Sequence, residues 1–328
     1  MNNRLANLER ILELTPLSAS RFVTSYLPAA PFGGKGTFGG TLVAQALLAA
    51  LYTVPEDFEP TSLHGYFVNA GNPSVMIQYH VSDLRHGRNF IHKQVKGYQH
   101  EKVVYTAMIL FSAKKTHDSL HHFKKLDVSK LPKVSSFYRA DELFEESVGK
   151  KVKNYQNLNE GFQDLTYVDR NIENFKHGVL DYRFPKDLFY SNKKYDLLRY
   201  YINCRQHVTK VYRRDRYEKI TPANDPRYSY VALAYLSDSY FLFVLPYFHN
   251  LPIYSHKFSV SLDHSIHFHQ QPDVNDFLLF EIRNPRSNLD KHLMEGEYFS
   301  RKTGEIVASV VQEGYVVYDR EEEIRAKF

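Results

Sequence analysis

The clearest pattern in the chain is an alternation of apolar and polar residues from Phe258 to His269. Apolar side chains hold every second position of this stretch, with His264 as the one exception. The intervening positions carry hydroxyls, a carboxylate and imidazoles (Ser259, Ser261, Asp263, Ser265, His267 and His269). A period of two predicts a half-buried β-strand. Its polar face is either exposed to water or part of a site that binds and moves protons.

The first third of the chain combines two helical patterns with a series of strands. Apolar residues at helical spacing predict a helix over residues 4–14, ending before Pro16. A loop rich in Pro and Gly (31–40) leads into a second helix, which is apolar from residue 42 to 51 except for Gln45. That helix is predicted to be buried almost all round, so Gln45 needs a polar partner. Turn residues then separate four predicted strands, over 61–69, 74–83, 89–98 and 103–113.

The apolar periodicity fades between residues 114 and 174, which predicts a linker with some helix over 139–148. Regular patterns then return. An apolar helix is predicted from Tyr228 to Leu245, directly before the alternating stretch. Further strands are predicted at 179–184, 197–205, 277–283, 293–300 and 306–317.

The same order of elements therefore occurs twice, and simple landmarks repeat at one offset. Ser62-Leu63 and Ser261-Leu262 are 199 positions apart, as are Gly97 and Gly296. This predicts a tandem duplication. The expected fold class is α+β, a double hotdog in which each unit is a central helix wrapped by an antiparallel sheet. The predicted division is a first unit (1–113), a linker (114–174), a second unit (175–322) and a tail (323–328).

Charge and cysteine content narrow the possible partners. Among 328 residues, 42 Lys and Arg are interleaved with 37 Asp and Glu for a net charge of +5. No basic stripe emerges, so nucleic acid is not an expected partner. The single cysteine, Cys204, excludes an internal disulfide and a multi-cysteine metal site. His267 and His269 share a strand face but have no third ligand at a suggestive spacing, so no metal is predicted. No signal peptide and no transmembrane segment are predicted.

Six segments, in this order, resemble the type II (TesB-like) acyl-CoA thioesterases over nearly the whole chain, and the fungal peroxisomal members most of all. They are Thr37-Phe38-Gly39-Gly40-Thr41, Ser62-Leu63-His64-Gly65-Tyr66-Phe67, Gly87-Arg88-Asn89-Phe90, Tyr235-Leu236-Ser237-Asp238, Ser261-Leu262-Asp263-His264-Ser265 and Val311-Gln312-Glu313-Gly314. The resemblance implies a water-activating trio of Asp238, Ser261 and Gln312. It also implies hydrolysis of fatty acyl-CoA to fatty acid and CoA without a cofactor.

The residue types agree with these roles, although each has a plainer interpretation. Asp238 interrupts an apolar helix, where a carboxylate is either at work or simply caps a second, shorter helix. Ser261 lacks the Gly-x-Ser-x-Gly elbow of a serine nucleophile, so it suits holding a water or is an ordinary strand serine. Gln312 ends an apolar strand; its amide can orient a water, or it faces the surface.

Other candidate groups concern the substrate. Asp263 and His264 neighbour the trio and are candidates for substrate binding. Arg85, Gly87 and Arg88 form a basic turn that either holds CoA phosphates or is merely solvated.

The tail Ala326-Lys327-Phe328 resembles the small-basic-hydrophobic peroxisomal address, so an import receptor is an expected partner and the peroxisomal matrix the expected location. A homodimer is expected by analogy with the family. Two alternatives remain open: an acyl-CoA hydratase or dehydratase using Asp263 and His264, or a non-catalytic acyl-CoA-binding scaffold.

Overall fold

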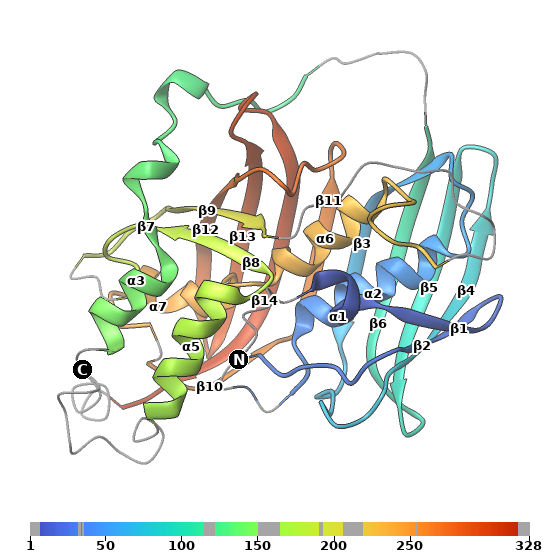
Figure 1. The fold of residues 1–328 in the computed structure, drawn as a ribbon, viewed down its shortest axis with the longest axis horizontal. Helices are drawn as coiled ribbons and strands as arrows, with labels where there is room; N and C mark the ends of the chain where they lie inside the picture. The colour runs from blue at the N-terminus through green and yellow to red at the C-terminus, as the bar shows by residue number, and fades with distance from the viewer. Residues whose placement is uncertain are drawn as a thin grey trace.

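A computed structural model describes residues 7–31, 34, 36–114, 122–149, 165–189, 193–205, 219–253 and 255–320. Fourteen strands form one sheet that curves around the central helices (Figure 1). Along the sheet the order is β1-β2-β4-β5-β6-β3-β11-β14-β13-β12-β9-β8-β7, with β10 also paired to β14. All strand pairs are antiparallel. This is the predicted double hotdog.

The first unit supplies six of these strands and the first central helix. Its elements are α1 (Leu8–Leu12), β1 (Leu14–Ser18), β2 (Arg21–Thr24), α2 (Gly39–Leu51), β3 (Phe58–Phe67), β4 (Gln78–His86), β5 (Phe90–Gln99) and β6 (Lys102–Ala113). Every residue of α2 after Gly39 is buried. The predicted need of Gln45 is met inside the unit, because the Tyr79 hydroxyl donates to its Oε1 (3.0 Å) and its Nε2 donates to the Ile11 carbonyl (3.2 Å).

The rest of the chain supplies the other strands and the second set of helices. Between the units lie η1 (Val128–Lys130), η2 (Val134–Ser136), β7 (Tyr138–Arg139), α3 (Ala140–Phe144), the π-helix η3 (Glu145–Gly149) and α5 (Leu165–His177). Then follow β8 (Leu180–Phe184), β9 (Leu198–Cys204), α6 (Tyr228–Ser237), η4 (Leu242–Val244), α7 (Leu245–Phe248), β10 (His256–Ser261), β11 (Asp263–Phe268), β12 (Leu278–Asn288), β13 (Lys291–Ser300) and β14 (Ile306–Tyr318).

The N-terminal prediction was partly wrong. The opening helix is only α1, and Pro16 lies inside β1 instead of following a helix. A proline is tolerated there because β1 is an edge strand, which leaves one row of backbone amides without a ladder partner. Residues 4–6 and the tail 323–328 lie outside the described residues. At the other boundary, α5 runs from Leu165 to His177 and so continues across residue 175.

The two units meet along β3 and β11, at the middle of the sheet. Gly65 pairs with His264, and these residues are themselves 199 positions apart. On either side, Leu63 pairs with Ile266 and the Phe67 amide donates to the Leu262 carbonyl (3.0 Å). The repeat is therefore related by an approximate two-fold axis through the Gly65–His264 pair. Gly65 leaves room on its side of the axis: a Cβ there would lie 1.9 Å from the Tyr105 hydroxyl.

A buried arginine of the second unit also contacts the first unit. Arg227, just before α6, donates to both carboxylate oxygens of Asp225 (3.0 and 2.8 Å), and both residues are buried. The same guanidinium donates to the carbonyls of Pro55 (2.8 Å) and Phe58 (3.1 Å) in the first unit. The hydrogen bonds of this one guanidinium hold the start of α6 against the start of β3.

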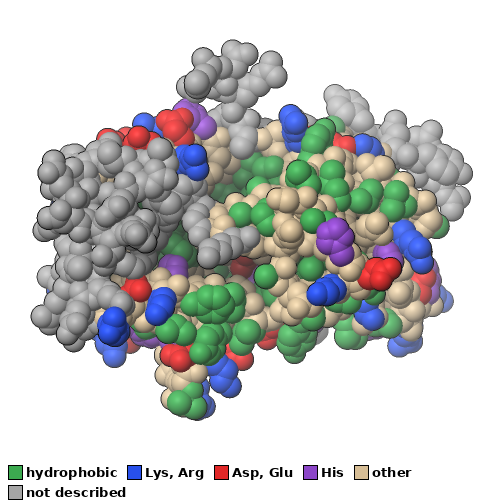
Figure 2. All heavy atoms as spheres, turned by 90° about the horizontal axis from the view of Figure 1, so that it is seen from below, with side chains coloured by type: hydrophobic (Ala, Val, Ile, Leu, Met, Phe, Trp, Pro, Cys, Tyr) green, Lys and Arg blue, Asp and Glu red, His purple; other side chains and the backbone are tan. Residues whose placement is uncertain are grey.

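The helices lie on the concave face of the sheet, with α2 and α6 packed together (Figure 1). The segment Tyr228–Phe248 has the length and apolar composition of a membrane span, but most of it is buried in the fold, so packing already accounts for its apolar character. On the face drawn in Figure 2, the coloured Lys and Arg side chains are scattered among acidic and hydrophobic ones.

The candidate active site

Asp238 stands where α6 ends. The predicted single helix from Tyr228 to Leu245 is interrupted here, because α6 stops at Ser237 and Tyr240 adopts a positive φ of 53°. Buried tyrosines hold this turn: the Tyr200 hydroxyl donates to the carbonyls of Ser239 (3.0 Å) and Tyr240 (3.3 Å). The turn places the Asp238 carboxylate at a helix end, beside the first unit.

The carboxylate meets the N-terminus of α2. A Cβ on Gly39 would lie 2.6 Å from Asp238 Oδ2, so only glycine allows this approach. The Gly40 amide and the Gln312 side chain lie close enough to the carboxylate to stabilise its ionised form, which lowers the pKa of Asp238. Burial raises the pKa of Asp238, and His264, Gln312 and the Gly40 amide only partly offset that rise. The raised pKa makes Asp238 a stronger base than an ordinary surface aspartate.

Gln312 and Ser261 complete the cluster. Gln312 is fully buried on β14, and its Nε2 donates to Ser261 Oγ (2.5 Å). The plainer interpretation of Gln312 as a surface residue is therefore wrong. Because Gln312 also lies close enough to Asp238 to lower its pKa, the three residues of the predicted trio come together from the end of α6, the end of β10 and the middle of β14.

A break in the alternating strand makes this convergence possible. The predicted single strand is two strands, β10 and β11, which both pair with β14 and are separated at Leu262. There the Asp263 carboxylate accepts the Glu313 amide (2.7 Å) in place of a ladder carbonyl. Because the break shifts the alternation by one residue, Ser261 and His264 both point toward Gln312. The faces of β10 are correspondingly reversed: Phe258 and Val260 are 50% and 38% exposed.

His264 contacts the trio through a hydrogen bond with Gln312. Its side chain is fully buried, with Nδ1 2.6 Å from Gln312 Oε1 and Nε2 2.8 Å from Ser237 Oγ. This burial leaves its ring between Gln312 and Ser237. Sequence reasoning missed Ser237, although a serine beside Asp238 in an apolar helix was a visible signal.

Comparison with known proteins identifies the family. A family model described as acyl-CoA thioesterase matches residues 201–315, and one described as acyl-CoA thioesterase N-terminal domain matches residues 28–112. The peroxisomal acyl-coenzyme A thioester hydrolase 1 of Saccharomyces cerevisiae is 52% identical, covering 99% of this chain and 98% of that protein. This chain belongs to the acyl-CoA thioesterase family.

More distant members cover the chain almost as fully. Human acyl-coenzyme A thioesterase 8 is 27% identical over 93% of this chain and 87% of its own length. The crystal structure of acyl-CoA thioesterase II TesB2 from Mycobacterium marinum superposes with a TM-score of 0.69, at 23% identity, over 96% of this chain and 99% of that one. The latter likeness supports the double-hotdog fold.

The basic turn of this thioesterase lies far from the trio. Arg85 lies near the end of β4, and Gly87 and Arg88 lie in the turn to β5, next to the end of β6 at Ser112. The site end of β6 is at Tyr105, which pairs with Phe67. Seven residues of strand separate the two ends, or about 23 Å at roughly 3.3 Å per residue. The structure therefore does not bring this turn to the carboxylate.

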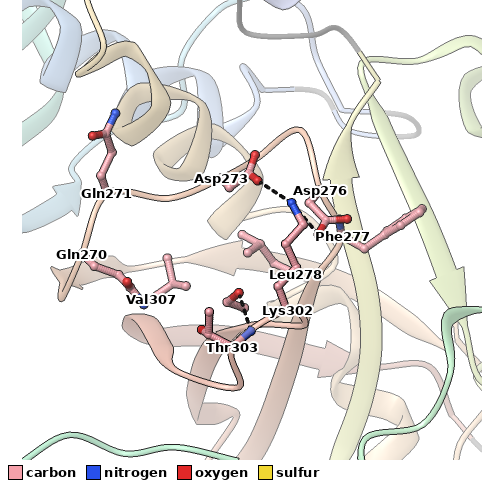
Figure 3. A pocket seen from close by; sticks show the side chains of 10 residues that line it. Gln270, Gln271, Asp273, Asp276, Phe277, Leu278, Lys302, Thr303 and Val307 are labelled. Atoms are coloured by element: carbon pink, nitrogen blue, oxygen red, sulfur yellow. Dashed lines mark hydrogen bonds and ion pairs between the residues drawn. The ribbon is translucent and has the colours of Figure 1, made fainter. Parts of the chain in front are cut away.

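A small hollow of about 120 Å³ also lies away from the trio, near the turn between β13 and β14 (Figure 3). Its charged groups are paired with one another: Lys302 Nζ contacts Asp273 (3.1 Å) and Asp276 (3.3 Å). Val307, in its lining, precedes Gln312 by five strand residues, or about 16 Å. The hollow is therefore separate from the cluster of Asp238, Ser261 and Gln312.

The first unit does not repeat the trio. At the offset of 199, the counterparts of Asp238 and Ser261 are Gly39 and Ser62. The first unit thus lacks a carboxylate at the equivalent position, and its Gly39 instead makes room for the carboxylate of the second unit. The thioesterase fold uses its two copies unequally.

Proposed function

We propose that this chain hydrolyses fatty acyl-CoA thioesters to a fatty acid and CoA, with Asp238 as the general base. The observation that carries the proposal is a buried carboxylate against the first residue of α2, with Gln312 close enough to lower its pKa and donating a hydrogen bond to Ser261. An amide and a hydroxyl beside a carboxylate can hold a water molecule for attack. The family to which the chain belongs catalyses this class of reaction.

In the proposed reaction, Asp238 removes a proton from a water that the Gln312 amide and the Ser261 hydroxyl orient. The water oxygen bonds to the acyl carbon, the carbon–sulfur bond breaks, and the proton passes to the departing thiolate. The negative charge that develops on the thioester oxygen is favoured by the N-terminus of α2, a helix of 13 residues that starts at this point. No acyl-enzyme forms and no cofactor takes part.

Residues around the trio have separate roles in the proposal. Asp263 holds the break between β10 and β11 through its bond to the Glu313 amide, and so fixes Ser261. In the proposal, the phosphate-bearing end of an extended CoA contacts Arg85, Gly87 and Arg88. These residues cannot contact the thioester, which lies at the opposite end of β6.

The proposal extends to the peroxisomal matrix and to a homodimer. The relative from Saccharomyces cerevisiae carries the description peroxisomal, and it matches 99% of this chain. Import would use Ala326-Lys327-Phe328 as the address that a receptor reads. These three residues lie outside the described part of the structure.

Thiol release from a series of acyl-CoAs tests the activity and the site together. Asp238→Asn removes the base while keeping the shape of the side chain, so we expect its kcat to fall by about 1,000-fold. The control is Ser62→Ala, at the first-unit position that corresponds to Ser261, and it should keep wild-type kcat. Equal rates for wild type and Asp238→Asn would refute the site. Conversion of an enoyl-CoA without thiol release would refute the activity in favour of a hydratase.

A further inference from the structure

A buried chain of hydrogen bonds runs behind the proposed base. It passes from Ser237 on α6 to His264 on β11 (2.8 Å), then to Gln312 on β14 (2.6 Å) and on to Ser261 on β10 (2.5 Å). Ser237, His264 and Gln312 are each 0% exposed. The three side chains are closed off from bulk solvent, so the hydrogen bonds that join them are made within the chain.

The direction of the Gln312 amide matters for the base. Its nitrogen donates to Ser261 and lies close enough to the Asp238 carboxylate to lower the pKa of that group, while its oxygen faces His264. An amide oxygen only accepts hydrogen bonds. His264 must therefore carry its proton on Nδ1 if the nitrogen of Gln312 is to stay toward Asp238.

The other side of the ring completes this requirement. Burial lowers the pKa of His264, which keeps the ring neutral with a single N–H. With that proton on Nδ1, Nε2 accepts the hydroxyl proton of Ser237. The same hydroxyl lies 2.9 Å from the Ala234 carbonyl, so Ser237 has a second acceptor within reach.

A reversed arrangement satisfies the same three side chains. If Nε2 carried the proton, it would donate to Ser237, whose hydroxyl would then donate to Ala234, and Nδ1 would accept from the Gln312 nitrogen. That arrangement turns the Gln312 oxygen toward the Asp238 carboxylate, and two acceptors facing each other repel. The ionised base and the Nδ1–H form of His264 therefore require each other.

We propose that His264, aligned by Ser237, is a positioning residue that fixes the orientation of the Gln312 amide and so keeps a donor facing Asp238. This inference rests on the proposed hydrolysis and adds a residue to it. His264 acts through Gln312 and needs no contact with substrate.

Kinetics of two variants test this role. His264→Leu fills the site but removes the donor, so we expect kcat to fall by about 100-fold while KM stays within about threefold. His264→Asn places an amide N–H where Nδ1–H was, and should recover at least about tenfold of that loss. His267→Leu, which changes an exposed histidine on the same strand, is the matched control and should keep wild-type kinetics.

A pH profile separates this role from simple packing. Besides His264, Gln312 and the Gly40 amide, the groups that face Asp238 are Tyr105 on β6, Tyr235 on α6 and Tyr298 on β13. Burial raises the pKa of all three phenols, so they stay neutral through the acidic range. Losing the oriented donor should move the acidic limb of kcat/KM to higher pH in His264→Leu. An unmoved limb with kcat above half of wild type would overturn the inference, as would equal losses in the Leu and Asn variants with an unmoved limb.

Nitrogen-15 NMR of the wild-type histidines provides a readout that needs no variant and no activity. We expect His264 as the neutral Nδ1–H tautomer, assigned by the signal that His264→Asn removes. An Nε2–H tautomer would overturn the inference even if the enzyme is active. A wild type that releases no thiol would instead refute the proposed function, so the two failures are distinguishable.

Discussion

Gly39 offers a precise perturbation of the base, because it touches Asp238 without taking part in the chemistry. It is the first residue of α2, and a Cβ built on it lies 2.6 Å from Asp238 Oδ2 and 3.0 Å from the Phe67 ring. Ordinary contacts of a Cβ begin at 3.4 Å. Gly39→Ala therefore forces the carboxylate oxygen back by 3.4 minus 2.6, or about 0.8 Å.

That displacement sets the size of the expected effect. A misplacement of roughly 1 Å in a catalytic group costs on the order of 100-fold in rate, which corresponds to about 2.7 kcal/mol of transition-state stabilisation. We expect Gly39→Ala to lower kcat by about this factor. Alanine is otherwise favoured over glycine in a helix by roughly 0.5–1 kcal/mol, so the overall stability should change little.

The assay is thiol release from acyl-CoA, with urea unfolding to confirm the fold. The control is Gly36→Ala, just before α2, because its Cβ would lie at an ordinary 3.5 Å from its nearest neighbour. The loss should also vanish when Gly39→Ala is made in an Asp238→Ala background, where no carboxylate remains to be displaced. A Gly39→Ala enzyme with more than half of wild-type kcat would refute the contact as drawn.

Two further predictions follow from burial. The folded state holds the Asp238 proton more tightly than the unfolded state, so ionising this group lowers the free energy of unfolding as pH rises through its raised pKa. Asp238→Asn should therefore unfold at a higher urea concentration than wild type at neutral pH, and this difference should shrink as pH falls toward about 4. Equal urea midpoints at neutral pH would contradict this prediction. Burial raises the pKa of Cys204 to about 12, so a disulfide reagent at mildly alkaline pH should label it only after unfolding, and rapid labelling of the native protein would show the site to be open.

The sequence predicted most of the second unit and the residues of the trio, but not how they meet. A period of two was enough to recognise β11, where Ile266 and Phe268 are buried and His267 is exposed. At the break beside Leu262, the Glu313 amide of another strand donates to the Asp263 carboxylate. A contact between residues 50 positions apart does not change the local periodicity. The sequence therefore predicted one continuous strand where the structure has β10 and β11.

The same reason explains the shortened helix. From Tyr228 to Leu245 the composition favours an uninterrupted buried helix, and Asp238 alone signalled a possible end. The turn is stabilised by the Tyr200 hydroxyl, which reaches the backbone at Ser239 and Tyr240 from β9. Likewise β1 and β2 were missed, since β1 contains a proline and β2 has only four residues.

The pair at the centre of the sheet has a consequence for how such a molecule can arise. Two identical chains associated about a true two-fold axis must present the same residue to each other on that axis. They could bring together two glycines or two histidines, but never one of each. Fusion into a single chain removes this restriction, and here Gly65 yields space to Tyr105 while its partner His264 contacts Ser237 and Gln312. Joining the copies thus permits one half to specialise in support while the other specialises in chemistry.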